Sequence, residues 1–234
     1  MIFRQLFDET SYTYSYLLAD EQTKEALIID SVEEKVEDYM LLLGELGLTL
    51  TATLDTHTHA DHITAASVLR DRTGCQSLVG KQSKADCASA KFQHKDLIKV
   101  GKHSLKVLYT PGHTDDSYSF LLDGPEPKLF SGDTLLIRGT GRTDFQNGSA
   151  AQQYRSLVDI LLALPGHTLV YPGHDYKGAS VSTIGEERQH NPRLKVASEQ
   201  DYVELMEALH LPNPALMDIA VPANQACGKH KPLA

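Results

Sequence analysis

The sequence predicts an α/β protein whose β-sheets are covered on the outside by helices. Three observations favour this class. Apolar runs of strand length recur along the chain, with helical segments between several of them. The strands cluster, and sheets ordered in this way need helices over their apolar faces. Histidine or aspartate follows several of the strands, at the ends where sheets present functional groups.

The first part of the chain is rich in apolar and β-branched runs that predict strands over residues 1–7, 11–19, 24–30 and 48–54. Between the third and fourth strand, residues 32–46 place apolar side chains at a spacing near 3.6, with acidic residues between them. This segment is therefore expected to be a helix that ends at Gly47. A second helix, over residues 63–72, is expected to end at Gly74.

Short strands recur in the second part, over residues 77–79, 97–100, 105–109, 118–122, 128–130 and 168–171. Residues 150–164, 182–190 and 199–209 are predicted as helices. From 212 to 234 the residues show no period, and a tail that wraps the domain is expected. With no repeat, low-complexity tract or linker, the prediction is one domain over residues 1–234, with a helical C-terminal extension from about residue 180.

Composition and charge limit the classes of partner. The 234 residues carry a net charge of −9, which argues against a nucleic-acid partner. No apolar run approaches the roughly 18 residues of a membrane-spanning helix. The first residues resemble a strand and lack the pattern of a signal or transit peptide. We therefore expect a cytoplasmic protein without a membrane partner, and a processed mitochondrial form fits the same sequence. A homodimer is compatible with it.

The three cysteines, Cys75, Cys87 and Cys227, are widely spaced and form no C-x-x-C pair. We expect three reduced thiols rather than a disulfide. Their roles cannot be read from their spacing.

One segment concentrates metal-binding side chains. His57, His59, Asp61 and His62 lie within six residues, directly after the strand predicted over 48–54. Histidine nitrogen and carboxylate oxygen suit zinc, iron or manganese. On an extended chain end, side chains two residues apart point the same way, which places His57 and His59 together. The segment predicts a metal site.

Three more candidate ligands have a similar placement. His113, Asp133 and His174 each follow an apolar strand and a turn that contains glycine. One Gly-His pair would be weak evidence, but four such strand-end groups in order are a strong signal. The spacing alone leaves open which metal binds and whether one or two ions are held.

In this order and spacing, the motifs H-x-H-x-D-H, G-H-T, G-D and G-H resemble the metallo-β-lactamase superfamily. The resemblance implies an αββα sandwich of the metallo-β-lactamase fold, with the metal site at one edge of the sheets. It covers about residues 10–180 through these motifs.

Two subfamilies fit, the persulfide dioxygenases and the glyoxalase II-like thioester hydrolases. The stretch G-T-G-R-T-D-F-Q, residues 139–146, resembles the dioxygenases more closely. The segments at residues 174–176, 191–193 and 221–224 also resemble the dioxygenases. With them, the resemblance extends over nearly the whole chain. Only 60 residues follow His174, which is few for the helical substrate domain of a glyoxalase II.

The closer resemblance implies an iron-dependent enzyme that oxidises glutathione persulfide with O2 to sulfite and glutathione. It implies one Fe(II) per chain, bound by the catalytic residues His57, His113 and Asp133. Two histidines and one carboxylate leave positions open for sulfur and O2, whereas zinc is redox-silent. On this interpretation His59, Asp61, His62 and His174 hydrogen-bond around the site or, alternatively, hold a second metal.

The same resemblance makes Arg142, Tyr176 and Arg193 candidate substrate contacts. An arginine would bind a carboxylate of glutathione despite the negative net charge, although Arg142 could instead pair with Asp144. The alternative function is a glyoxalase II-like hydrolase of glutathione thioesters, in which a dinuclear metal site activates a hydroxide. The intact ligand set argues against a third reading, a member that has lost its metal and its activity.

Overall fold

The computed structural model describes residues 1–212 and 216–229. They form two compact units, and each is described by itself. Unit 1 comprises Met1–Phe92, Lys99–Ser104 and the described residues from 216 onward, and unit 2 comprises Gln93–Ile98 and Leu105–Pro212. The predicted single domain with an extension from about residue 180 stays a prediction. Within the described ranges, no helix is long and apolar enough to span a bilayer.

Unit 1 is built on a six-stranded sheet with strands in sequence order. The strands are β1 (Ile2–Asp8), β2 (Thr13–Ala19), β3 (Glu25–Ile29), β4 (Thr49–Leu54), β5 (Gln76–Gly80) and β6 (Ala90–Phe92). The pairs β1–β2 and β2–β3 are antiparallel, and the pairs from β3 to β6 are parallel. Parallel strands end at the same edge, so β4 delivers the residues after Leu54 to the edge where β3 also ends.

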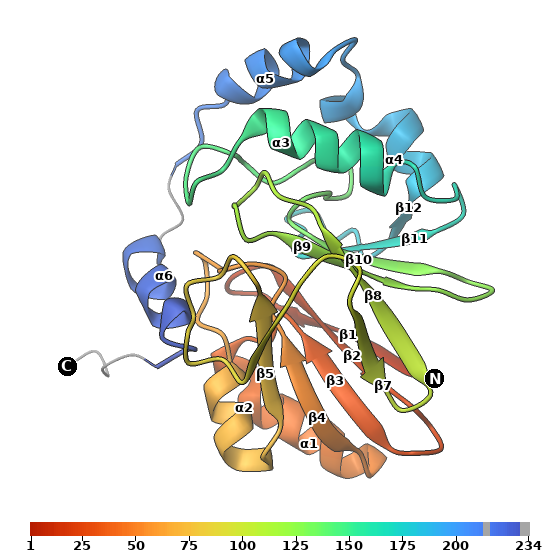
Figure 1. Ribbon diagram of the computed structural model, residues 1–234, viewed down its shortest axis with the longest axis vertical. Helices are drawn as coiled ribbons and strands as arrows, with labels where there is room; N and C mark the ends of the chain where they lie inside the picture. The colour runs from red at the N-terminus through yellow and green to blue at the C-terminus, as the bar shows by residue number, and fades with distance from the viewer. Residues whose placement is uncertain (213–215, 230–234) are drawn as a thin grey trace. The chain divides into compact units, whose positions relative to one another are not determined.

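The helices of unit 1 are η1 (Glu33–Lys35), α1 (Val36–Leu46), α2 (Ala66–Thr73) and α6 (Met217–Gln225). Figure 1 shows α1 and α2 along one face of this sheet. They bury an apolar core with β2, β3 and β4 that includes Leu17, Ile28, Tyr39, Leu50 and Leu69. As predicted, α1 and α2 end at glycines with positive φ, 61° at Gly47 and 75° at Gly74.

The second sheet has the order β12-β11-β10-β9-β8-β7. Its strands are β7 (Leu97–Val100), β8 (His103–Tyr109), β9 (Tyr118–Leu122), β10 (Lys128–Gly132), β11 (Leu169–Pro172) and β12 (Ser182–Thr183). The pair β10–β11 is parallel, whereas β8–β9, β9–β10 and β11–β12 are antiparallel. The parallel pair brings the residues after β10 and β11 to one edge.

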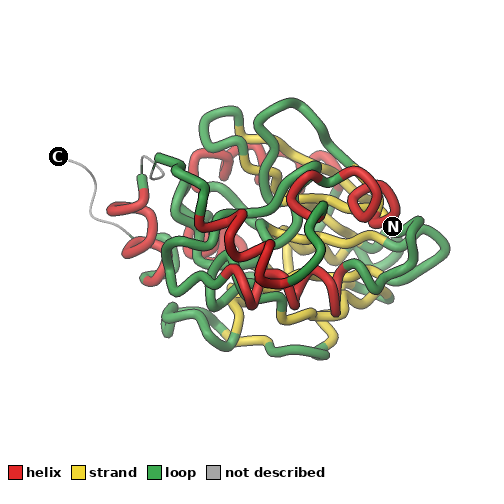
Figure 2. The backbone as a smooth tube through the Cα atoms, turned by 90° about the horizontal axis from the view of Figure 1, so that it is seen from above, coloured by secondary structure: helices red, strands yellow, loops and turns green. Residues whose placement is uncertain are grey.

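Helices cover the sheet of unit 2. They are α3 (Ala150–Arg155), its π-helical continuation η2 (Ser156–Leu161), α4 (Ile184–His190), η3 (Pro192–Leu194) and α5 (Glu199–Glu207). Figure 1 shows α3 and α5 above this sheet, and in Figure 2, seen from above, they lie in front of its strands. Leu157, Leu161, Val170 and Tyr202 form its core. Ile160 and Leu164, from the segment predicted as a helix, pack partly buried against this core.

Two expectations from the sequence are wrong. The C-terminal tail was expected to have no regular structure, but it contains the helix α6. Residues 213–215 and 230–234 of that tail lie outside the described residues. Cys87 and Cys227 form a disulfide, and Cys75 is a buried free thiol. The pairing joins residues 140 positions apart, because α6 packs against the segment after β5. Spacing along the chain carries no information about such a contact.

Candidate metal centre

His57 lies three residues beyond the end of β4 and is buried in unit 1. The hydroxyl of Thr56 donates to Asp30 Oδ2 at 2.9 Å, so its oxygen accepts from His57 Nδ1, also at 2.9 Å. This places the proton of the neutral imidazole on Nδ1 and leaves the lone pair on Nε2. A buried histidine held in this tautomer is suited to bind a metal through Nε2.

Asp30 organises this segment. It directly follows β3, is buried, and accepts the Thr56 N–H at 2.7 Å as well as the Thr56 hydroxyl. Oδ1 also lies 3.1 Å from His59 Nε2. Sequence reasoning assigned Asp30 no role, although an acidic residue directly after the apolar run 26–29 was an available signal.

His59, Asp61 and His62 offer a second set of donor atoms within unit 1. Their ligand atoms lie within 4.8 Å of one another. Burial by itself would lower the pKa of His59, but the charge of Asp30 and its hydrogen bond raise this pKa to about 9. Among the described residues, no partner approaches the buried His59 Nδ1. This orphaned atom fits a metal ligand, because a bound ion would displace its proton.

Asp61 and His62 are also tied to the strand β2. Thr13 donates its hydroxyl to Asp61 Oδ2 at 3.1 Å, and His62 Nδ1 lies 2.9 Å from the same oxygen. These bonds orient both side chains, as expected for residues around a metal site.

In unit 2, His113 follows β8 and is nearly fully buried. Its Nδ1 donates to the carbonyl oxygen of Arg142 at 2.7 Å, which again puts the lone pair of the neutral imidazole on Nε2. His113 Nε2 lies 3.6 Å from Asp133 Oδ2. The two atoms are close enough to bind one ion.

Asp133 and His174 come together because they follow β10 and β11, the parallel pair of the sheet. His174 Nδ1 lies 2.6 Å from Asp133 Oδ1. One carboxylate oxygen is thus engaged by His174, and the other faces His113. This geometry agrees with a supporting role for His174, which the sequence interpretation gave it.

A buried hydrogen-bond chain from the covering helices holds the stretch that contacts His113. Tyr202 of α5 donates to Gln153 Oε1 at 2.7 Å, and Gln153 Nε2 donates to the Gly141 carbonyl at 3.1 Å. Burial raises the pKa of Tyr202 to about 12, so the phenol stays a donor at neutral pH. The sequence carries no signal for Gln153 or Tyr202, because each lies in a helix without a ligand-like neighbour.

The Arg142 guanidinium, 12% exposed, is held on several sides. Nε and Nη2 donate to the two carboxylate oxygens of Asp144, each at 2.6 Å, and Nη1 donates to the Pro212 carbonyl at 2.6 Å. Its Cζ also lies 4.8 Å from the ring centroid of Phe145. The arginine thus makes the pair with Asp144 that the sequence left open, and this pair raises the pKa of Arg142 and lowers that of Asp144.

The other two predicted substrate contacts differ in exposure. Tyr176 is 64% exposed, and its ring stacks on His174 with centroids 6.2 Å apart. Arg193 is half-buried, and its Nη1 lies 3.0 Å from Met206 Sδ. Burial lowers the pKa of Arg193. No described acidic side chain forms an ion pair with it.

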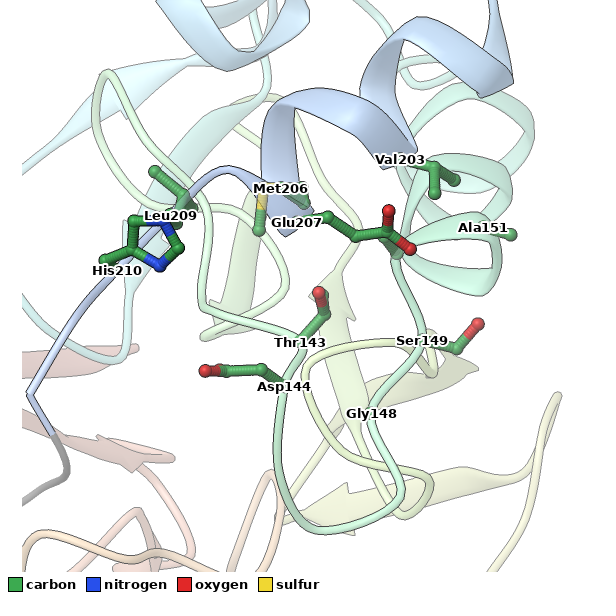
Figure 3. A pocket seen from close by; sticks show the side chains of 11 residues that line it. Thr143, Asp144, Gly148, Ser149, Ala151, Val203, Met206, Glu207, Leu209 and His210 are labelled. Carbon is green, nitrogen blue, oxygen red and sulfur yellow. The ribbon is translucent and has the colours of Figure 1, made fainter.

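A cavity of about 530 Å³ lies in unit 2 beside the Arg142–Asp144 pair. Figure 3 shows it between α5 and the loop that carries Thr143 and Asp144, with Glu207 reaching over it from α5. Its volume is in the range of small-molecule sites, which is about 300–1,000 Å³. Its wall offers two carboxylates, Asp144 and Glu207, and the imidazole of His210.

The chain is similar in sequence and in structure to known proteins. The sequence profile of the metallo-beta-lactamase superfamily matches residues 9–85 and 89–174. The mitochondrial persulfide dioxygenase ETHE1 of Mus musculus is 45% identical over 99% of this chain and 91% of its own length. The Homo sapiens protein of the same name is 44% identical over 100% and 91%.

A crystal structure of ETHE1 from Myxococcus xanthus superimposes with a TM-score of 0.95 and 53% identity, covering 98% of this chain and 100% of that one. The profile and this structure confirm the predicted αββα fold class.

Proposed function

Because the chain belongs to the metallo-beta-lactamase superfamily, we propose that it is a persulfide dioxygenase that converts glutathione persulfide, O2 and water to sulfite and glutathione. Similarity to proteins of that name over nearly the whole chain carries this proposal. The stretch 139–146 supports it, since its backbone contacts His113 directly. A cytoplasmic location is part of the same proposal.

We propose one Fe(II) per chain, held by His57, His113 and Asp133. Hydrogen bonds at Nδ1 put the lone pair of both histidines on Nε2, and the spacing of His113 Nε2 and Asp133 Oδ2 suits a shared ion. Iron bound there would supply open positions for a sulfur ligand and for O2. His174 keeps Asp133 in place, and Asp30 holds the His57 segment.

The substrate's peptide part would lie in the cavity of unit 2. Its γ-glutamyl ammonium group would suit Asp144 or Glu207, which line the wall. We propose Arg142, Tyr176 and Arg193 as residues that position the peptide. Arg193 has the charge for a carboxylate, and Tyr176 has an exposed ring beside His174.

The second candidate is the glyoxalase II-like hydrolase with a dinuclear metal site. One observation favours it: His59, Asp61 and His62 could hold a second ion. Two metals would then activate a hydroxide for attack on a thioester. The number and identity of the bound metals separate the two candidates.

Protein purified without oxygen is expected to contain one iron per chain and to consume O2 when glutathione persulfide is added. One sulfite should form for each O2 consumed. Both oxygen atoms of O2 enter the same sulfite, and its third oxygen comes from water. Elemental analysis and an oxygen electrode measure the two quantities, with a glutathione thioester as the control substrate. Two tightly bound zinc ions together with thioester hydrolysis would refute the proposal.

Replacing Arg142 with Ala should lower kcat/KM while the iron content stays near that of the wild type. Iron should stay because His113 hydrogen-bonds to the backbone carbonyl of residue 142, which the variant keeps. A charge-assisted hydrogen bond between the guanidinium and the substrate would contribute about 1.5–3 kcal/mol. Its loss corresponds to a decrease in kcat/KM of roughly 10- to 100-fold.

Arg188→Ala is the matched control, because that guanidinium also binds backbone carbonyls in unit 2, those of Leu162 and Leu164, away from the cavity. It should keep wild-type kinetics. If Arg142→Ala loses iron or unfolds, the Arg142–Asp144 pair is structural and the substrate role is withdrawn.

A further inference from the structure

Helix α6 belongs to unit 1, and a disulfide attaches it there. Cys227, just beyond the helix, bonds to Cys87 in the segment that follows β5. Cys227 is buried beside Val79 and Ala85, whereas Cys87 is exposed. Cys87 is therefore the side of the pair that small molecules in solution can approach.

Asn224, in the last turn of α6, uses its whole amide on the segment that carries the histidines. Its Oδ1 accepts the Thr64 N–H at 2.9 Å, and its Nδ2 donates to the carbonyls of His59 and His62, both at 2.9 Å. The side chain is 6% exposed. A buried amide with three satisfied bonds to one loop holds that loop in a single conformation.

Two further contacts keep the end of α6 against the same loop. Ala220 and Ala223 pack on Ile63. A Cβ at Gly228 would collide with the Thr64 carbonyl, so the chain after α6 lies directly on the loop. Cys227 itself has φ of 60°, a conformation that is costly for a residue with a side chain. Without its covalent bond, Cys227 would gain by leaving this conformation.

We propose that Asn224 is a positioning residue for the metal-binding loop, and that the Cys87–Cys227 disulfide makes this positioning sensitive to small thiols. The inference rests on the proposed function for the role of His57 as a metal ligand and for glutathione as the thiol that is present. When the disulfide is intact, α6 holds the loop from His59 to Thr64. When it is reduced, the end of α6 is released and the loop opens more often.

The chemistry is a thiol–disulfide exchange. A thiolate of the glutathione class attacks the exposed Cys87 sulfur, forms a mixed disulfide with it, and releases Cys227 as the leaving thiolate, which takes up a proton. A second thiolate attacks the sulfur of the bound small thiol and frees Cys87. Two small thiols are oxidised to their disulfide, and the protein gains two thiols. Glutathione is also the thiol product of the proposed reaction, so it would be present where the enzyme works.

The test compares metal-loaded protein in its oxidised form with the same protein equilibrated against increasing ratios of reduced to oxidised glutathione. Alkylation should count one free thiol before reduction and three after it. Hydrogen exchange at the Thr64 amide should become faster by roughly tenfold or more in the reduced form. Chelators should remove the metal correspondingly faster. Reoxidation should restore both properties, which irreversible unfolding would not.

Variants separate the contributions. Asn224→Ala should speed Thr64 exchange with the disulfide still formed, and Cys87→Ser should reproduce reduction. Cys75→Ala removes the remaining thiol without touching α6 and should exchange like the wild type. Equal Thr64 exchange in oxidised and reduced protein would overturn the inference, as would faster exchange throughout β2 and β3, which indicates general destabilisation. A protein with this exchange response but no persulfide oxidation would refute the proposed function and leave the positioning role supported.

Discussion

His113→Ala is expected to leave the protein without bound iron and without O2 consumption on glutathione persulfide. The substitution removes Nε2, which lies 3.6 Å from Asp133 Oδ2, and leaves a site with too few donors. The loss of activity should exceed the roughly 10- to 100-fold that residues around a ligand typically cost. Elemental analysis and oxygen uptake measure the result on protein purified without oxygen.

His190→Ala is a suitable control, because that side chain is exposed at the end of α4. It should keep the metal and the activity. Circular dichroism establishes whether His113→Ala is folded. A folded variant that still binds one iron per chain would show that His113 is not a ligand, and the three-residue set would have to be abandoned.

Gly141→Ala is expected to have the second largest effect, although it adds only a methyl group. A Cβ at this position would lie 2.7 Å from His113 Nδ1 and would also collide with the Asp133 carbonyl. Both neighbours belong to the proposed metal centre, and the Gly141 N–H bonds to the same carbonyl at 2.7 Å. The imidazole must move away, and its bond to the Arg142 carbonyl is lost. Metal affinity should fall by roughly 10- to 100-fold.

Gly139→Ala, two residues earlier in the same stretch, is the matched control. Its added Cβ would meet only the Leu136 Cβ, at 3.8 Å, which is an ordinary contact. Competition with a chromogenic chelator gives the metal affinity of both variants, and thermal melting reports whether each is folded. Wild-type affinity in Gly141→Ala would mean that His113 does not depend on this close approach.

Much of the architecture follows from the sequence because local periodicity reports which face of an element is buried. The strands from β1 to β4 and the helices α1 and α3 lie where the pattern of apolar residues predicted them. Short edge strands are different. β6 and β12 have three and two residues, too few to show a period, and they form only because a neighbouring strand offers hydrogen-bond partners.

The juxtaposition of the candidate ligands in unit 2 was likewise predictable, because strand ends are where a sheet presents functional side chains. His113, Asp133 and His174 meet in unit 2, as their places after β8, β10 and β11 implied. What the motifs could not reveal is the partner that holds each ligand. His113 is held by the backbone carbonyl of Arg142, an atom that every residue has. His57 is held by the hydroxyl of Thr56, a group that is common along the chain.

Only the tertiary structure decided the contacts between distant segments. Asp30 meets Thr56 because β3 and β4 are parallel neighbours. Arg142 meets the Pro212 carbonyl, 70 residues further along the chain, and Cys227 reaches Cys87 across 140 residues. Periodicity shows which face of a segment is buried in the core. It does not show which other segment packs against that face. That choice comes from the packing of whole elements, since each buried polar group must find its partner wherever the fold brings one.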